Sequence, residues 1–184
     1  MRSLRRAAPA EIRVDASDER TIAPTGELVG APMGELAADG LDPQRWGELA
    51  RKVLTAWGVV GPAEMSLSFV DEAEIAELNE RWLDESGPTD VLSFPLDDPR
   101  DSSARSPDGM CSLGDVVVCP SVARRYAVEH GREPDAETAL LVVHGVLHVL
   151  GYDHAEADEE ATMQALEERY LTEFFDPKWS RTAR

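Results

Sequence analysis

The chain has 184 residues, 42% of them hydrophobic, which is enough for one globular domain with a sizeable core. It carries 18 basic and 36 acidic residues, and the resulting formal net charge of −18 excludes indiscriminate binding of polyanions. No apolar run is long and apolar enough to span a bilayer, and no signal peptide follows the basic residues at the N-terminus. We therefore expect a cytoplasmic protein with no membrane partner.

The N-terminal part of the chain predicts little regular structure. Residues 1–10 are expected to be disordered, and the alternation of residues 11–15 predicts a first strand. Residues 16–40 are rich in Gly, Pro and Ala and are interpreted as a long loop or a flexible insertion. Residues 1–40 are thus expected to form a partly disordered segment around one strand.

Regular structure is expected from residue 42 onward. Asp42 and Pro43 should begin a helix that runs to Trp57 and stops at Gly58. The alternating run at residues 65–70 predicts a half-buried strand.

The next helix and two further strands also have local signals. Asp71 is expected to cap the helix, with Glu74 as its capping-box partner. The helix should bury one stripe of side chains, made of Ile75, Leu78 and Trp82. Residues 89–96 predict a strand whose Pro95 belongs at a sheet edge, and residues 112–119 predict a buried strand.

Three helices are expected in the last third of the chain, at about residues 120–130, 135–150 and 157–174. The last should turn three side chains inward, which are Met163, Leu166 and Tyr170. Its acidic pair Glu167-Glu168 is interpreted as solvated surface.

Together these elements predict a single α+β domain, in which a mixed sheet of about four strands packs against helices. We expect the domain at residues 41–176 and a tail at residues 177–184. The two cysteines, Cys111 and Cys119, could pair, but buried thiols are favoured in a cytosolic chain.

Three of the four histidines lie within eleven residues, in the run His144-Gly-Val-Leu-His148-Val-Leu-Gly-Tyr-Asp-His154. Residues four apart share one face of a helix, and a glycine after them lets the chain turn back with the third histidine. A catalytic zinc ion needs three protein ligands and one open position. The alternative is a pair of core histidines, but each buried imidazole then needs other partners or costs about 1–3 kcal/mol. The spacing therefore predicts one metal ion per chain.

The same spacing occurs in the metzincin proteases, where a glutamate follows the first histidine and acts as general base. Gly145 occupies that position here and cannot accept a proton, which disfavours a peptidase. A structural zinc site is a further alternative, but such sites usually have four closed ligands, often cysteines. Asp153 could be a fourth ligand or an acceptor for an imidazole N–H.

The histidine run resembles the signature of the YbeY family, bacterial metal-dependent endoribonucleases of ribosomal RNA maturation. Two further blocks are similar to the family's: Leu78-Asn-Glu-Arg-Trp82 followed by Gly87-Pro-Thr-Asp-Val-Leu-Ser-Phe-Pro95, and Leu113-Gly-Asp-Val-Val-Val-Cys119. The blocks appear in family order, and the resemblance covers about residues 42–175.

The resemblance implies a zincin-like metal-binding helix and one zinc ion on His144, His148 and His154. It implies a single-strand-specific endoribonuclease that matures 16S-type ribosomal RNA and acts in ribosome quality control, with the small ribosomal subunit and its proteins as partners. Many members carry Arg where this chain has Leu83, and Arg81 is the nearest substitute. Alternatives that remain are a non-catalytic ribosome-assembly factor with a structural zinc, and a zinc peptidase or amidase.

Other site residues are expected from the chemistry of RNA cleavage, which needs a positioned nucleophile and a proton acceptor. Arg81 and Asp153 are the candidate catalytic residues. Thr89 and Ser93 are expected to line the cleft, although both could simply bond backbone groups. Since the chain is acidic overall, RNA must meet a local basic patch, for which Arg124 and Arg125 are the leading candidates.

Overall fold

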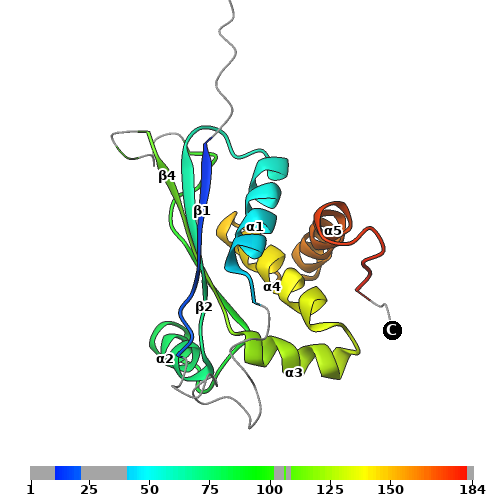
Figure 1. Cartoon of the computed structure of the whole chain (residues 1–184). Coiled ribbons are helices and arrows are strands. Elements are labelled where there is room, and N and C mark those ends of the chain that lie inside the picture. The colour runs from blue at the N-terminus through cyan, green and yellow to red at the C-terminus, as the bar shows by residue number, and fades with distance from the viewer. Residues whose placement is uncertain (1–10, 22–40, 102–105, 107–108, 182–184) are drawn as a thin grey trace, which may run out of the picture.

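Four strands form one mixed sheet in the order β1-β2-β4-β3 (Figure 1). The computed structural model describes residues 11–21, 41–101, 106 and 109–181. Neighbours β1, β2 and β4 are parallel, and β3 runs antiparallel to β4 at one edge. The strands are β1 (Ile12–Asp18), β2 (Ala63–Phe69), β3 (Val91–Pro95) and β4 (Cys111–Val118). The predicted mixed α+β sheet is confirmed, as is the edge position of Pro95.

Five helices accompany the sheet in the described part of the chain. They are α1 (Pro43–Trp57), α2 (Glu72–Leu83), α3 (Pro120–His130), α4 (Pro134–Val149) and α5 (Ala157–Phe174). Helix α1 packs on β1 and β2, α4 packs on β3 and β4, and α5 lies outside α1 and α4. Helix α2 lies on the opposite side of the sheet (Figure 1). The histidine helix α4 is therefore held between the sheet and an outer helix.

The predicted helix starts are confirmed at α1 and α2. The Asp42 side chain accepts a hydrogen bond from the Gln44 backbone N–H, and Asp71 accepts one from Glu74. Such caps satisfy amide groups that have no partner within the first helical turn. Gly58 ends α1 in the left-handed conformation.

Three expectations need correction or extension. Strand β1 continues through residues 16–18, which the composition had assigned to a loop, because these residues pair with β2. Trp82 is not buried, since its exposed fraction is 60%. Part of the expected tail is packed, because Trp179 is buried in the core. Residues 1–10, 22–40 and 182–184, expected to be disordered, inserted or tail, lie outside the described residues.

The main core fills the space between the sheet and the helices α1, α4 and α5. Both cysteines are free and buried, as predicted. Burial raises the pKa of the Cys119 thiol, so it stays protonated at neutral pH and is a poor metal ligand. Within the described residues, no helix is long and apolar enough to cross a membrane.

Gly145 allows α4 to approach the sheet closely. A Cβ atom at this position would lie 2.5 Å from Val116 Cγ1 on β4 and 3.2 Å from Ser93 Oγ on β3. Ser93 Oγ in turn donates a hydrogen bond to the Gly145 carbonyl oxygen over 3.3 Å. Any side chain at residue 145 would thus run into the sheet.

We expect Gly145→Ala to destabilise the protein by about 1–2 kcal/mol, because overpacking costs more than the gain in helix propensity of about 1 kcal/mol. Urea denaturation of the zinc-free protein measures the free energy of unfolding. If there were free space beside residue 145, the added methyl group would raise the free energy of unfolding through its helix propensity. An unchanged or higher free energy of unfolding would therefore contradict the close packing.

Candidate metal centre

Helix α4 presents two histidines side by side. His144 and His148 are one helical turn apart, and their ring centroids are 4.6 Å from each other. Both rings are partly buried, and their Nε2 atoms face each other at 3.0 Å. The helix thus brings two nitrogen atoms to one point.

The turn after α4 returns the third histidine to the same point. Gly151 adopts the left-handed conformation with φ of +86°, which L side chains rarely adopt. The Tyr152 backbone N–H then donates to the Leu147 carbonyl oxygen over 3.0 Å, which holds the turn against the helix. The His154 ring lies with its centroid 5.4 Å from that of His144 and 5.0 Å from that of His148.

The three rings can hold one metal ion. One ligand nitrogen from each histidine lies within 4.8 Å of the other two, and no other cluster of this kind occurs among the described residues. The predicted convergence of His144, His148 and His154 is therefore seen in the fold.

The outer nitrogens of two rings fix which nitrogen carries the proton. His144 Nδ1 lies 2.7 Å from Glu167 Oε1, and His148 Nδ1 lies 2.9 Å from the Tyr152 carbonyl oxygen. Both oxygens accept hydrogen bonds, so both Nδ1 atoms must donate. In the neutral rings each Nε2 atom then carries a lone pair.

Two lone pairs facing each other at 3.0 Å repel unless a metal ion or a proton lies between them. Two nitrogens on one tetrahedral zinc ion, each about 2.0–2.1 Å from it, are about 3.3 Å apart. The observed separation is close to this value. The donor set and its tautomers therefore fit a metal ion.

The surroundings of His148 keep its imidazole neutral, which is the form that binds a metal ion. Burial, together with the neighbouring His144 and His154, lowers the pKa of the His148 imidazole below its ordinary value. The ring is therefore neutral at pH 7, and its Nε2 lone pair is free to bind a metal.

Glu167 is a functional residue that the sequence interpretation missed. Its side chain is 2% exposed, accepts from His144, and is paired with Arg181. Arg181 is held in turn by its carbonyl oxygen, which accepts from Arg132. The assignment of Glu167 to solvated surface is wrong, because α5 turns this residue inward while the adjacent Glu168 remains exposed.

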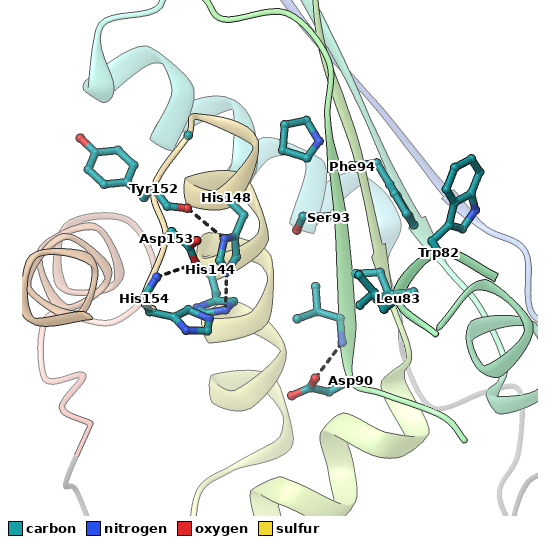
Figure 2. A pocket seen from close by; sticks show the side chains of 14 residues that line it. Trp82, Leu83, Asp90, Ser93, Phe94, His144, His148, Tyr152, Asp153 and His154 are labelled. Carbon is teal, nitrogen blue, oxygen red and sulfur yellow. Dashed lines mark hydrogen bonds between the residues drawn. The ribbon is translucent and has the colours of Figure 1, made fainter. Parts of the chain in front are cut away.

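The histidines open into a cavity of about 670 Å³, within the usual range of about 300–1,000 Å³ for ligand pockets. We call it the histidine pocket. The histidines, with Tyr152 and Asp153, line one end of it; β3 runs across the middle, and Phe94 and the end of α2 line the part beyond β3 (Figure 2). The lining residues are Trp82, Leu83, Asp90, Val91, Leu92, Ser93, Phe94, Pro95, His144, His148, Gly151, Tyr152, Asp153 and His154.

Besides the three histidines, two of the candidate residues lie in this pocket. Asp153 is exposed, and its Oδ1 accepts a hydrogen bond from the His154 backbone N–H over 2.7 Å. Asp153 is not the acceptor for His144 or His148, since the outer nitrogens of these rings lie against Glu167 and the Tyr152 carbonyl oxygen. Ser93 lines the pocket and bonds the Gly145 carbonyl oxygen as well.

The other candidates lie outside the pocket lining. Thr89 donates a hydrogen bond to Asp90, and Arg81 lies with its guanidinium carbon 5.4 Å from the centre of a Trp82 ring. Arg124 is partly buried on α3, and the exposed Arg125 is paired with Glu72. The structure does not bring Arg124 and Arg125 into the histidine pocket.

The rim of the pocket carries a cation that the sequence interpretation passed over. Arg100 Nη2 would lie 3.1 Å from a Cβ atom at Gly151, so its guanidinium covers the turn that carries His154. It is exposed and paired with Asp98, an ion pair of the kind that contributes little to stability. The loop that follows β3 carries Arg100 there, and no sequence motif marks it.

We expect Glu167→Gln to lower metal affinity about 10- to 100-fold, because the amide orients His144 less firmly than the carboxylate does. Competition with a chromogenic chelator measures the affinity. The matched control is the exposed neighbour Glu168→Gln, which should bind metal as the unmodified protein does. Equal affinities for both variants would show that Glu167 has no role in the metal centre.

The chain is similar in sequence to proteins of one family. The family model described as Endoribonuclease YbeY matches residues 37–175. A relative from Beutenbergia cavernae, named Endoribonuclease YbeY, is 47% identical over 134 residues, which are 73% of this chain and 89% of the relative. One from Acidothermus cellulolyticus with the same name is 49% identical over 136 residues, 72% of this chain and 83% of the relative.

The fold also has a solved counterpart. The solution structure of TM1509 from Thermotoga maritima superimposes with a TM-score of 0.53 over 90% of each chain, at 24% sequence identity. This similarity concerns the fold alone. The match of the family model and the identity to its named relatives together show that the chain belongs to the Endoribonuclease YbeY family.

Proposed function

We propose that this protein is a zinc-dependent endoribonuclease that cleaves single-stranded RNA during maturation of small-subunit ribosomal RNA. The observation that carries the proposal is the pair of facing Nε2 atoms of His144 and His148, beside which His154 completes a three-histidine site. Membership of the family and the names of the relatives support the choice of RNA as substrate.

Zinc is the metal we propose, because three imidazoles and one open position are the usual ligands of a catalytic zinc ion. When bound, such an ion lowers the pKa of its water to about 7 and stabilises charge on a phosphoryl oxygen. The chain's own residues hold the site in place: Glu167 orients His144, and the Tyr152 carbonyl oxygen orients His148.

We assign the proton-accepting role to Asp153. It is exposed, lies in the histidine pocket and directly precedes His154. Asp90 is less suited, because its carboxylate accepts from both the Thr89 hydroxyl and the Val91 backbone N–H and so helps to hold the start of β3.

The alternatives receive less support from the fold. A peptidase of the metzincin kind needs a glutamate at residue 145, where a side chain would collide with Val116. A structural zinc would need a closed fourth ligand, but the described cluster consists of histidines alone and opens into a pocket.

The setting we propose is the small ribosomal subunit in the cytoplasm, including its quality control. A net charge of −18 repels naked RNA, whereas ribosomal proteins are basic and can dock an acidic surface. Local cations must still meet the RNA backbone. Arg100 and Arg81 flank the histidine pocket, beside Gly151 and Trp82, and we propose both as phosphate contacts.

We expect zinc-loaded protein to cleave a single-stranded RNA and zinc-free protein to leave it intact, with activity restored by adding zinc. The control for contaminating nucleases is His154→Ala, purified in the same way, which should stay folded because this residue is exposed but should lose most metal binding and cleavage. Equal cleavage by the zinc-free protein or by this variant would refute the proposed activity.

For Arg100→Ala we expect a rise in KM for RNA and a loss of salt dependence equivalent to about one phosphate contact. Arg125→Ala, which removes a paired cation outside the pocket, should change KM less. Cleavage rates measured between low and high salt test both variants. A larger effect for Arg125→Ala would place the RNA path along α3 instead.

A further inference from the structure

Large apolar side chains line the part of the histidine pocket that lies beyond strand β3, across this edge strand from the histidines (Figure 2). Trp82 and Leu83, from the last turn of α2, are 60% and 56% exposed. Phe94, from β3, lies edge-on to Trp82 with ring centroids 6.0 Å apart and an interplanar angle of 64°. We call these three residues the aromatic wall (Figure 2).

The aromatic wall rests on a rigid support. Phe94 packs against the smaller core cluster, which contains Leu92 of β3 and Ile75 of α2. Trp82 in turn packs edge-on against Phe94 and carries the Arg81 guanidinium near its ring. Single exposed apolar residues are ordinary, whereas a contiguous group beside a functional pocket marks a binding surface.

Charge indicates what kind of group the wall receives. The described lining of the histidine pocket contains two carboxylates, Asp90 and Asp153, and neither arginine nor lysine. A phosphate group would be repelled from this lining except at a bound metal ion. The flat and largely neutral part of a nucleotide is its base, and bases stack on exposed aromatic rings.

We infer that Trp82, supported by Phe94, stacks an unpaired base of an RNA strand that crosses the edge strand β3 to reach the histidines, and that this contact selects single strands. A paired base is already stacked within its helix and cannot reach the ring unless the duplex opens. The inference rests on the proposed function, since it names the part of the substrate that the same pocket binds.

The test compares Trp82→Ala and Trp82→Phe with the unmodified zinc-loaded protein. Binding is measured by fluorescence anisotropy of a labelled 2′-O-methyl oligonucleotide, checked to be intact afterwards, either single-stranded or annealed to its complement. Cleavage of the corresponding unmodified RNA gives kcat and KM. Since Trp82 is mostly exposed, both variants should keep their thermal unfolding midpoint, which circular dichroism checks.

We expect Trp82→Ala to weaken single-strand binding and to raise KM about tenfold, as expected for loss of one base–aromatic stack. Binding of the duplex and kcat should change less than twofold by the same reasoning, because a paired base does not reach the ring. Trp82→Phe should recover most of the loss, since a smaller ring still stacks. The matched control is Tyr126→Ala, an exposed aromatic residue on α3 outside the pocket, which should behave as the unmodified protein.

Equal weakening of single strand and duplex, or an unchanged KM in Trp82→Ala, overturns the inference while leaving zinc-dependent cleavage in place. So does a variant that binds RNA normally but loses affinity for small ribosomal subunits, because the wall then docks a protein. If the unmodified protein binds single strands through Trp82 but cleaves no RNA with zinc, the proposed function fails and the stacking surface remains.

Discussion

The facing Nε2 atoms of His144 and His148 determine what the histidine pocket can bind. Each ring is held there by a hydrogen bond on its far side, one to Glu167 from α5 and one to the backbone of Tyr152. Two acceptors of this kind force two lone pairs of the neutral rings toward each other, an arrangement that a metal ion or a shared proton makes favourable. The geometry of the candidate metal centre is therefore set by hydrogen bonds of the fold.

Several distant parts of the chain converge on this arrangement. Gly145 seats α4 on the sheet, Gly151 turns the chain back toward it, and α5 supplies Glu167 from the outer layer. Arg181, near the end of the described chain, pairs with Glu167 and balances its buried charge. Removing Arg181 would leave the buried Glu167 carboxylate without this partner, whereas the Arg181 side chain is 36% exposed and can be solvated by water. Stability and metal binding are thus linked through one side chain.

The elements whose signals lie within a few residues could be predicted from the sequence. The caps Asp42 and Asp71, the alternation of β2 and the histidine spacing of α4 are local, and each appears in the fold. They lead to a mixed sheet and to three converging imidazoles, because helix geometry alone places residues four apart on one face. Family resemblance then supplied the substrate class, which no local pattern contains.

What escaped prediction depends on contacts between distant segments. Glu167 and Glu168 are adjacent residues of the same type. Only the orientation of α5 about its axis makes Glu167 buried and Glu168 exposed. Trp82 continues an apolar stripe but lies in the last turn of α2, beyond the smaller core, so the same spacing leaves it at the pocket. Arg100 reaches the histidine turn through a loop of no regular structure. Periodicity in the sequence predicts which residues share a face of a helix or strand. It does not predict which other part of the chain packs against that face.

We propose that three imidazoles hold a metal ion and leave one position open for water. Zinc K-edge X-ray absorption spectroscopy of the zinc-loaded protein measures the ligand set directly. We expect three imidazole nitrogens and one further light atom, all about 2.0–2.1 Å from the metal. A thiolate in the first coordination sphere, or a fourth imidazole in place of the exchangeable ligand, would contradict it.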